Sequence, residues 1–273
     1  MAKLETEREK TYQETLILLR EHQEPPDVAD SVREDKATSE VLSEESGKNQ
    51  ATQEAGPGDI AEPYEPKLRP TRVTVSSAQL NAKLTEAAVM KAFRLTYGGM
   101  VDIVPDIKIG NTFADAAITS PNKRIPDLLV DIRTVSSPSS ARLRLDEAIS
   151  WSLRAQRAAK KDLQRYFIPT VFLIVYDRPP SNKPGSDSDV HRLNPTTERV
   201  RLAAVGAFED LQEVHLPLNV VIGSTRDLTP SNLSKVSWHT DRPRVIDLRV
   251  MQQSVPPQMR QSAGDLNDYS AHP

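Results

Sequence analysis

Two aspartates and an arginine are the residues whose types and spacing most suggest chemistry. Asp115 lies inside the segment TFADAAIT, and Asp131 and Arg133 lie inside the segment LLVDIRTV. Both segments have the composition of β-strands, and residues two positions apart on a strand point to the same face. Asp131 and Arg133 are therefore predicted to share a face, where a carboxylate from a neighbouring strand can join them. Because a charge within an apolar strand is costly unless it is paired or bound to a metal, these residues predict a site.

Two carboxylates beside a fixed cation suit the cleavage of phosphodiester bonds. Carboxylate oxygens are ligands for Mg²⁺ or Mn²⁺, and a bound divalent ion supplies an activated water at a phosphate. In this hypothesis Asp115 and Asp131 hold the metal, and Arg133, which stays protonated, offsets charge on the phosphate. The alternative is a buried ion-pair cluster of the same three residues without a metal.

The segments around these residues follow the order helix, three strands, helix, strand. The first helix comes after Ser76 and Ser77 and stops at the glycines of the TYGG sequence. Further on, the sequence predicts strands at 100–110, 112–119, 128–135 and 170–177, a long helix at 142–167, a helix at 199–214, a strand at 218–224 and an edge strand near 245–250. This order predicts an α/β domain with a mixed central sheet flanked by helices, in which the long helix crosses from the third strand to the fourth.

With these elements, residues 76–177 resemble the restriction-endonuclease-like superfamily, the PD-(D/E)XK nucleases. That family has an α-β-β-β-α-β core, with an aspartate on the second strand and an acid-X-Lys motif on the third. The resemblance matches Asp115 and Asp131 to the two acids and places Arg133 where the family has lysine. It also implies that Glu86, on the first helix, assists catalysis as an auxiliary acidic residue.

Taken further, the resemblance implies a hydrolase that depends on Mg²⁺ or Mn²⁺ and cleaves DNA. Because arginine cannot give up a proton as lysine can, the departure at Arg133 leaves a second possibility open. In that alternative, the chain is a nuclease fold with a decayed site that binds nucleic acid or a protein partner in a larger assembly.

The long predicted helix carries a row of basic residues. Arg154, Arg157 and Lys161 are spaced i, i+3 and i+7, with Lys160 beside them. Such a face can follow nucleic-acid phosphates without reading the base sequence, and Gln156 is the polar residue that the resemblance places there. A solvated helix face with no ligand is the alternative.

The charge of the chain is unevenly distributed. Residues 24–66 contain 12 acidic and 3 basic residues, whereas residues 67–273 contain 28 basic and 21 acidic residues. The first of these stretches has few apolar residues, which predicts disorder. The sequence thus predicts four parts: an N-terminal helix at 1–23, a disordered acidic linker at 24–70, the nuclease-like domain at 71–250 and a disordered tail at 251–273. The helix and linker are candidates for contact with a protein partner, although a marginal surface helix is equally compatible with the sequence.

Several classes of function are excluded by the composition. The chain has no cysteine, and its five histidines are scattered without the spacing of a zinc site. It has no glycine-rich phosphate loop and no nucleophile elbow. No apolar run is long enough to span a membrane, and the start MAKLETEREK is too charged for a signal peptide. These features predict an intracellular protein, cytoplasmic or nuclear, that contacts no membrane.

Overall fold

The computed structural model describes residues 2–36, 38–39, 72–121, 125–135, 138–175, 198, 202, 217–238 and 241–249. Its helices are α1 (Ala2–Glu21), α3 (Arg72–Tyr97), α4 (Pro138–Ala158) and α6 (Pro230–Leu233), with a short helix at 26–36 that we call helix 26–36. Its strands are β1 (Asp102–Ile109), β2 (Thr112–Thr119), β3 (Leu128–Val135), β4 (Ile168–Val175), β5 (Asn219–Ser224) and β6 (Arg244–Asp247). None of the helices in these ranges is long and apolar enough to cross a membrane.

The strands form one mixed sheet in the order β1-β2-β3-β4-β5-β6. β1, β2 and β3 are antiparallel neighbours, whereas β3, β4, β5 and β6 run parallel. Every residue of β4 and β5 is buried, as expected for central parallel strands with both faces covered. The predicted α/β class, with a mixed sheet flanked by helices, is therefore confirmed.

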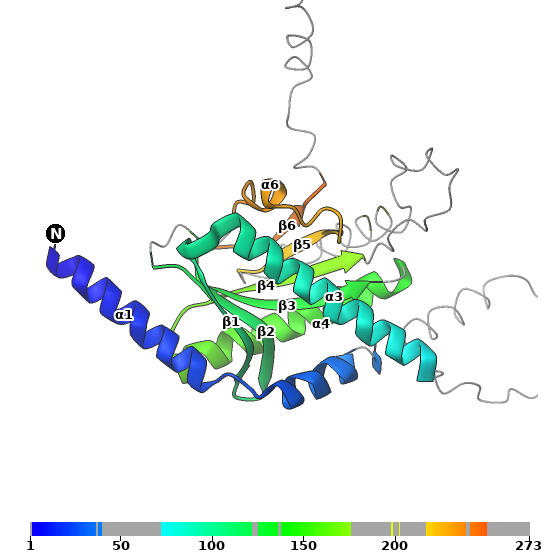
Figure 1. The fold of residues 1–273 in the computed structure, drawn as a ribbon, viewed down its shortest axis with the longest axis horizontal. Coiled ribbons are helices and arrows are strands. Elements are labelled where there is room, and N and C mark those ends of the chain that lie inside the picture. Colours follow the sequence, from blue (N-terminus) through cyan, green and yellow to red (C-terminus); the bar gives the residue numbers. More distant parts are fainter. Residues whose placement is uncertain are drawn as a thin grey trace, which may run out of the picture.

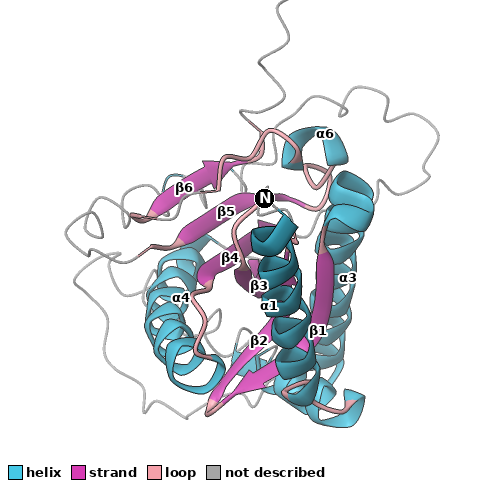
Figure 2. Cartoon of the chain, turned by 90° about the vertical axis from the view of Figure 1, so that its left-hand side faces the viewer, coloured by secondary structure: helices cyan, strands magenta, loops and turns pink. Residues whose placement is uncertain are grey.

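Helices cover both faces of the sheet, as Figures 1 and 2 show. α3 and α6 pack on one face, where Phe93 and Leu233 join the buried side chains of the parallel strands. α4 and α1 lie on the other face, where Leu19, Leu145 and Trp151 belong to a second core cluster. The sheet is thus the middle of three layers, and each face has its own apolar core.

The chain on either side of β3 matches the predicted boundaries closely. β2 and β3 span the ranges predicted for them. α4 begins at Pro138, earlier than predicted, and ends in a π-helical turn, η2 (Ala159–Leu163), that is capped by Gln164 in the left-handed region. Most of the predicted helix at 199–214 and the tail at 251–273 lie outside the described residues.

The prediction of a disordered linker from residue 24 onward is wrong for its first part. Residues 22–24 lie beside the outer edge of β1: Lys108 N–H donates to His22 O at 2.9 Å, and Glu24 N–H donates to Asp106 O at 2.8 Å. Helix 26–36 follows and buries Ala29 completely. The remaining residues of the predicted linker, apart from 38 and 39, lie outside the described part. This segment escapes detection because charged residues rather than apolar ones attach it to the domain.

The N-terminal helix is likewise part of the domain rather than a separate element. Leu16 and Leu19 of α1 are buried in the core cluster on the α4 side of the sheet. The Tyr12 hydroxyl donates a hydrogen bond to Asp102 at the start of β1. The apolar face that the sequence offered to a partner is therefore covered by the chain's own sheet.

Candidate active site

The site forms where β2 and β3 stop pairing. Their antiparallel register covers Ala116–Ile118 opposite Leu128–Val130, and Asp115 and Asp131 are the next residues on the two strands. Instead of a strand-to-strand bond, the Ile132 N–H donates to the Asp115 carboxylate at 2.5 Å. The β1–β2 hairpin turns away from β3 beyond this point (Figure 1). The divergence leaves room for two acidic side chains at the same place.

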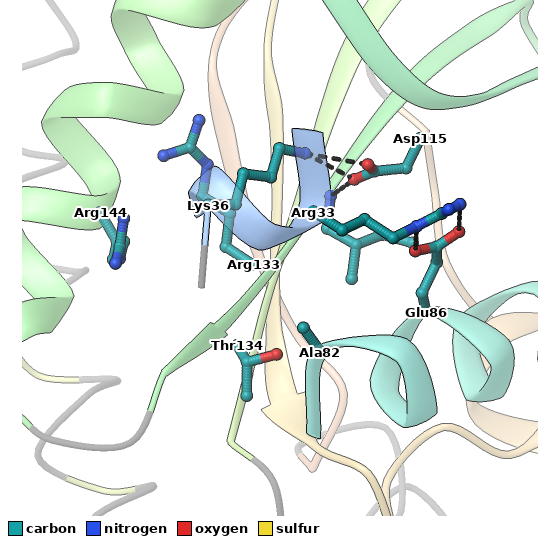
Figure 3. A pocket seen from close by; sticks show the side chains of 9 residues that line it. Arg33, Lys36, Ala82, Glu86, Asp115, Arg133, Thr134 and Arg144 are labelled. Carbon is teal, nitrogen blue, oxygen red and sulfur yellow. Dashed lines mark hydrogen bonds and ion pairs between the residues drawn. The ribbon is translucent and has the colours of Figure 1, made fainter. Parts of the chain in front are cut away.

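Lys36, from helix 26–36, meets both of these carboxylates. Its Nζ lies 2.9 and 3.1 Å from the two Asp115 oxygens (Figure 3). The same Nζ lies 2.7 Å from Asp131 Oδ1. The Asp131 side chain is 0% exposed and that of Asp115 is 3% exposed, whereas that of Lys36 is 29% exposed. The predicted convergence of Asp115 and Asp131 is therefore present, and a single cationic atom bridges them.

Arg133 shares the face of Asp131, as its i, i+2 spacing predicts. Its Nε donates to Asp131 Oδ2 at 2.5 Å, and its NH1 group pairs with Glu147 on α4. Arg144, one turn before Glu147, donates to the same carboxylate at 2.8 Å. Arg133 is thus clamped between the sheet and α4 and acts as a fixed cation.

Glu86 lies on α3 near Asp115 but is engaged elsewhere. Its two carboxylate oxygens accept from Nε and NH2 of Arg33, both at 2.7 Å. The same guanidinium also pairs with Asp106, which has a positive φ of 56° on β1. The predicted auxiliary acid therefore anchors helix 26–36 in this structure (Figure 3).

The charges at the site act on the two aspartates in opposite directions. Burial raises the pKa of Asp115 to about 6, because the attraction of Lys36 only partly offsets desolvation and the repulsion of Asp131. Burial also disfavours the Asp131 anion, but Lys36 and Arg133 outweigh it and lower the pKa of Asp131 to about 2. For Lys36, burial lowers the pKa, yet the two aspartates raise it to about 12. Lys36 therefore stays charged at neutral pH.

The two aspartates suit a hard divalent cation, because they supply carboxylate oxygens and because these oxygens point to one place. Carboxylates are the ligands that Mg²⁺ prefers, and Asp115 and Asp131 already converge on one cationic centre. Mg²⁺ sits about 2.1 Å from its oxygen ligands, so its position would overlap that of the ammonium group. Within the described ranges, no group of three or more acidic or histidine residues is arranged to hold a metal. Asp115 and Asp131 are thus the residues that would hold one, after Lys36 withdraws.

The predicted nucleic-acid-binding residues lie on α4 and its last turn. Arg154, Arg157, Lys160 and Lys161 are exposed, and Gln156 is half-buried. Of these, Arg154 lines an open groove of about 570 Å³ that Lys36, Arg133 and Arg144 also border. The π-helical turn carries Lys160 and Lys161, so they do not continue the regular α-helical face of Arg154 and Arg157.

Sequence reasoning did not place Lys36, Arg33, Glu147 or Arg144 at the acid pair, although Arg144 is one of the basic residues of the predicted long helix. One signal for the first two was present, because Arg33 and Lys36 are the first basic residues in the acidic stretch that begins at residue 24. Their i, i+3 spacing places both on one side of a helix.

The chain was compared with protein-family models, with curated proteins and with solved structures. None of these three comparisons finds a match.

Proposed function

We propose that this protein is a metal-dependent nuclease that cleaves DNA phosphodiester bonds at the Asp115–Asp131 pair. The observation that carries the proposal is the meeting of both carboxylates at one cationic atom, Lys36 Nζ. Two buried acids held together in this way form a position that favours a cation. The element order α3, β1, β2, β3, α4, β4 supports the assignment, because it is the order of the PD-(D/E)XK core.

Each residue of the site has a role in this proposal. Asp115 and Asp131 hold the ion, and Arg133 offsets charge on the phosphate from a position fixed by Asp131 and Glu147. Mg²⁺ or Mn²⁺ would supply Lewis acidity and an activated water. Lys36 competes for the same two carboxylates, so the form with helix 26–36 seated is the resting form of the enzyme. Because its pKa is raised, Lys36 leaves by moving and not by losing its proton.

A second function is favoured by the same contacts. Lys36 and Arg133 together satisfy Asp115 and Asp131 without a metal, which is what a decayed nuclease fold would need. Such a protein would bind nucleic acid or a protein partner and would not cut. The two functions differ in how the protein responds to a divalent ion.

Cleavage by the full chain tests the proposal directly. Supercoiled plasmid and linear DNA are incubated with Mg²⁺, Mn²⁺ or EDTA and with the wild type, Lys36→Met and Asp131→Asn. We expect nicking that depends on the metal, faster in Lys36→Met at limiting metal, and lost in Asp131→Asn. Circular dichroism establishes that each variant is folded.

Two results would count against the nuclease. If neither the wild type nor Lys36→Met cuts DNA in either metal, the decayed module takes its place. If Asp131→Asn cuts as fast as the wild type, another site is responsible. A metal-induced rise in melting temperature reports binding separately from cleavage, since a ligand that binds only the folded state stabilises it.

A further inference from the structure

Arg144 is a buried guanidinium whose hydrogen-bonding capacity is only partly used. The residue is 4% exposed and lies on α4, where its NH1 group donates to Glu147 at 2.8 Å. Its Nε and NH2 atoms have no hydrogen-bond partner in the described part of the chain. A buried charged donor without an acceptor is costly, because it has lost its hydration and gained nothing in return.

Thr134, on β3, is a second residue near the acid pair whose polar group is buried. Thr134 is 7% exposed, and its Oγ1 finds no partner among the residues that the structure describes. Arg144 and Thr134 both line a cavity of about 40 Å³ that also reaches Asp115 and Lys36 (Figure 3). Two unsatisfied polar side chains, from β3 and from α4, therefore border one cavity next to the acid pair.

The charge around this cavity favours an anion once a divalent ion is present. The cavity and its ion pairs hold four cations, Arg33, Lys36, Arg133 and Arg144. They are matched by the four carboxylates of Glu86, Asp115, Asp131 and Glu147. Exchange of the lysine for a divalent ion adds one positive charge. The planar edge of a guanidinium with two free N–H directions matches the oxygens of a phosphate.

We propose that Arg144 forms a phosphate-binding subsite next to the acid pair, and that its ligand is a backbone phosphate of the nucleic acid. The choice of a backbone phosphate rests on the proposed nuclease function, whereas the oxyanion subsite does not. Arg144 donates to the phosphate oxygens through its free Nε and NH2 groups. Thr134 alternates with Arg133 on β3, so its hydroxyl reaches the cavity from the α3 face of the sheet and is not part of the subsite.

The surrounding surface gives a nucleic acid a path to this subsite. Lys36, Arg133 and Arg144 border both the small cavity and the open groove of about 570 Å³ on which Arg154 lies. Withdrawal of Lys36 would therefore join the cavity to the groove. The groove is also lined by the carboxylates of Asp35, Asp146 and Glu147. A strand lying in the groove would present one phosphate to Arg144 and a neighbouring one to the acid pair.

Phosphate titration of the full chain tests the subsite. Isothermal titration in chloride buffer measures the binding of inorganic phosphate to the wild type, Arg144→Gln, Arg144→Lys and Thr134→Val. Each is measured with Lys36 present and in a Lys36→Met background, with Mn²⁺. Arg142→Gln is the matched control, because Arg142 is an exposed arginine on the same helix that does not line the cavity.

We expect Arg144→Gln to weaken phosphate binding by about tenfold or more, since hydrogen bonds from charged groups are the stronger ones. Thr134→Val should leave phosphate binding unchanged, because Thr134 points to the opposite face of the sheet. Arg144→Lys keeps the positive charge but lacks the planar pair of N–H donors. Its phosphate affinity should lie between those of the wild type and Arg144→Gln. Arg144→Lys also serves as the test if Arg144→Gln does not fold. No phosphate binding in either background, or equal binding by all the variants, would overturn the subsite.

Oligonucleotides distinguish the source of the phosphate. Binding of single-stranded and duplex DNA is measured with Mn²⁺ in the Lys36→Met background, by rapid mixing so that binding is recorded before cleavage proceeds. Weaker binding in Arg144→Gln but not in Arg142→Gln supports a backbone phosphate. If inorganic phosphate binding depends on Arg144 and oligonucleotide binding does not, the ligand is a free anion and the backbone assignment is wrong. Phosphate binding that depends on Arg144, in a protein that cuts no DNA, would retain the subsite and reject the nuclease.

Discussion

Helix 26–36 contacts the rest of the domain through two cations that meet very different acids. Arg33 forms a fork-shaped pair with Glu86 and reaches Asp106, and all three side chains are partly accessible to solvent. Lys36 points a single ammonium group at Asp115 and Asp131, which are almost completely buried. The first contact depends on the planar shape of a guanidinium, which no ion reproduces. The second depends on charge at one point, which a metal ion can supply.

In the proposed function, the Arg33 contact is an attachment, and the contact of Lys36, one turn further on at the C-terminal end of the helix, is exchangeable. The attachment is reinforced by the backbone hydrogen bonds between residues 22–24 and β1. The exchangeable end precedes a part of the chain that lies outside the described residues. An opening that releases Lys36 therefore need not release Arg33, and the following predictions test whether the two contacts are separable.

Replacement of Lys36 by methionine should have the largest effect. It leaves two adjacent buried carboxylates with Arg133 as their remaining cation, so we expect the metal-free protein to lose about 3–5 kcal/mol of unfolding free energy. With the competitor gone, the dissociation constant for Mn²⁺ should fall by about tenfold or more, which corresponds to about 1.4 kcal/mol. Denaturant unfolding and calorimetric titration measure the two effects. Lys10→Met, an exposed lysine on α1, is the control and should leave Mn²⁺ binding unchanged.

A fall in pH should change the unfolding free energy differently through Asp131 and through Asp115. The pKa of Asp131 is lowered from 3.8 to about 2 in the folded state, so its ionised form stabilises the fold above pH 4, and this contribution is lost as the pH falls towards 2. The shift corresponds to about 2 kcal/mol. The difference in unfolding free energy between the wild type and Asp131→Asn should therefore shrink by this amount between pH 4 and pH 2.

Over the acidic range, the contribution of Asp115 to the unfolding free energy should change in the opposite direction. Its pKa is raised to about 6, so the folded state binds the proton more tightly and its contribution to stability grows as the pH falls from 6 to 4. Comparison of the wild type with Asp115→Asn over that range measures this contribution. A difference that does not change with pH would mean that the two aspartates do not titrate separately.

Replacement of Arg33 by glutamine should loosen the attachment with a smaller cost. Hydrogen bonds to charged groups contribute about 1.5–3 kcal/mol each, and exposure to solvent places the partly accessible Arg33–Glu86 pair at the lower end of that range. We expect helix 26–36 to exchange its amide hydrogens faster and Mn²⁺ to bind severalfold more tightly. If Mn²⁺ affinity rises as much as it does in Lys36→Met, the Arg33 and Lys36 contacts open together and are not separable.

The smallest effect is expected on the outer face of α4. Arg157 and Lys161 are exposed and lie outside the groove beside the acid pair. The double variant Arg157→Ala/Lys161→Ala should leave metal binding unchanged. It should reduce the slope of log affinity for duplex DNA against log salt by about 2, if each contacts one phosphate. An unchanged slope would identify these residues as a solvated surface.

Much of the fold follows from local patterns in the sequence. The alternation and apolar content of 112–119 and 128–135 predict β2 and β3 with their observed bounds, because period-two burial is a short-range signal. The i, i+2 spacing of Asp131 and Arg133 likewise predicts their ion pair. The association of helix 26–36 could not be predicted in this way. Its contacts join residues 33 and 36 to positions that are 50 or more residues away, and they are ionic, so no apolar period marks them.

The sequence by itself determined the mixed α/β class, the strand that carries each aspartate and the absence of cysteine chemistry, since these depend on composition and on neighbours along the chain. Only the tertiary structure decided which cation faces the acid pair. Asp115 and Asp131 meet because the pairing of β2 with β3 stops at the Ala116–Val130 pair, and Lys36 reaches them because residues 22–24 hold the preceding chain against β1. Ion pairing between distant residues depends on distance in space, which a linear pattern does not encode.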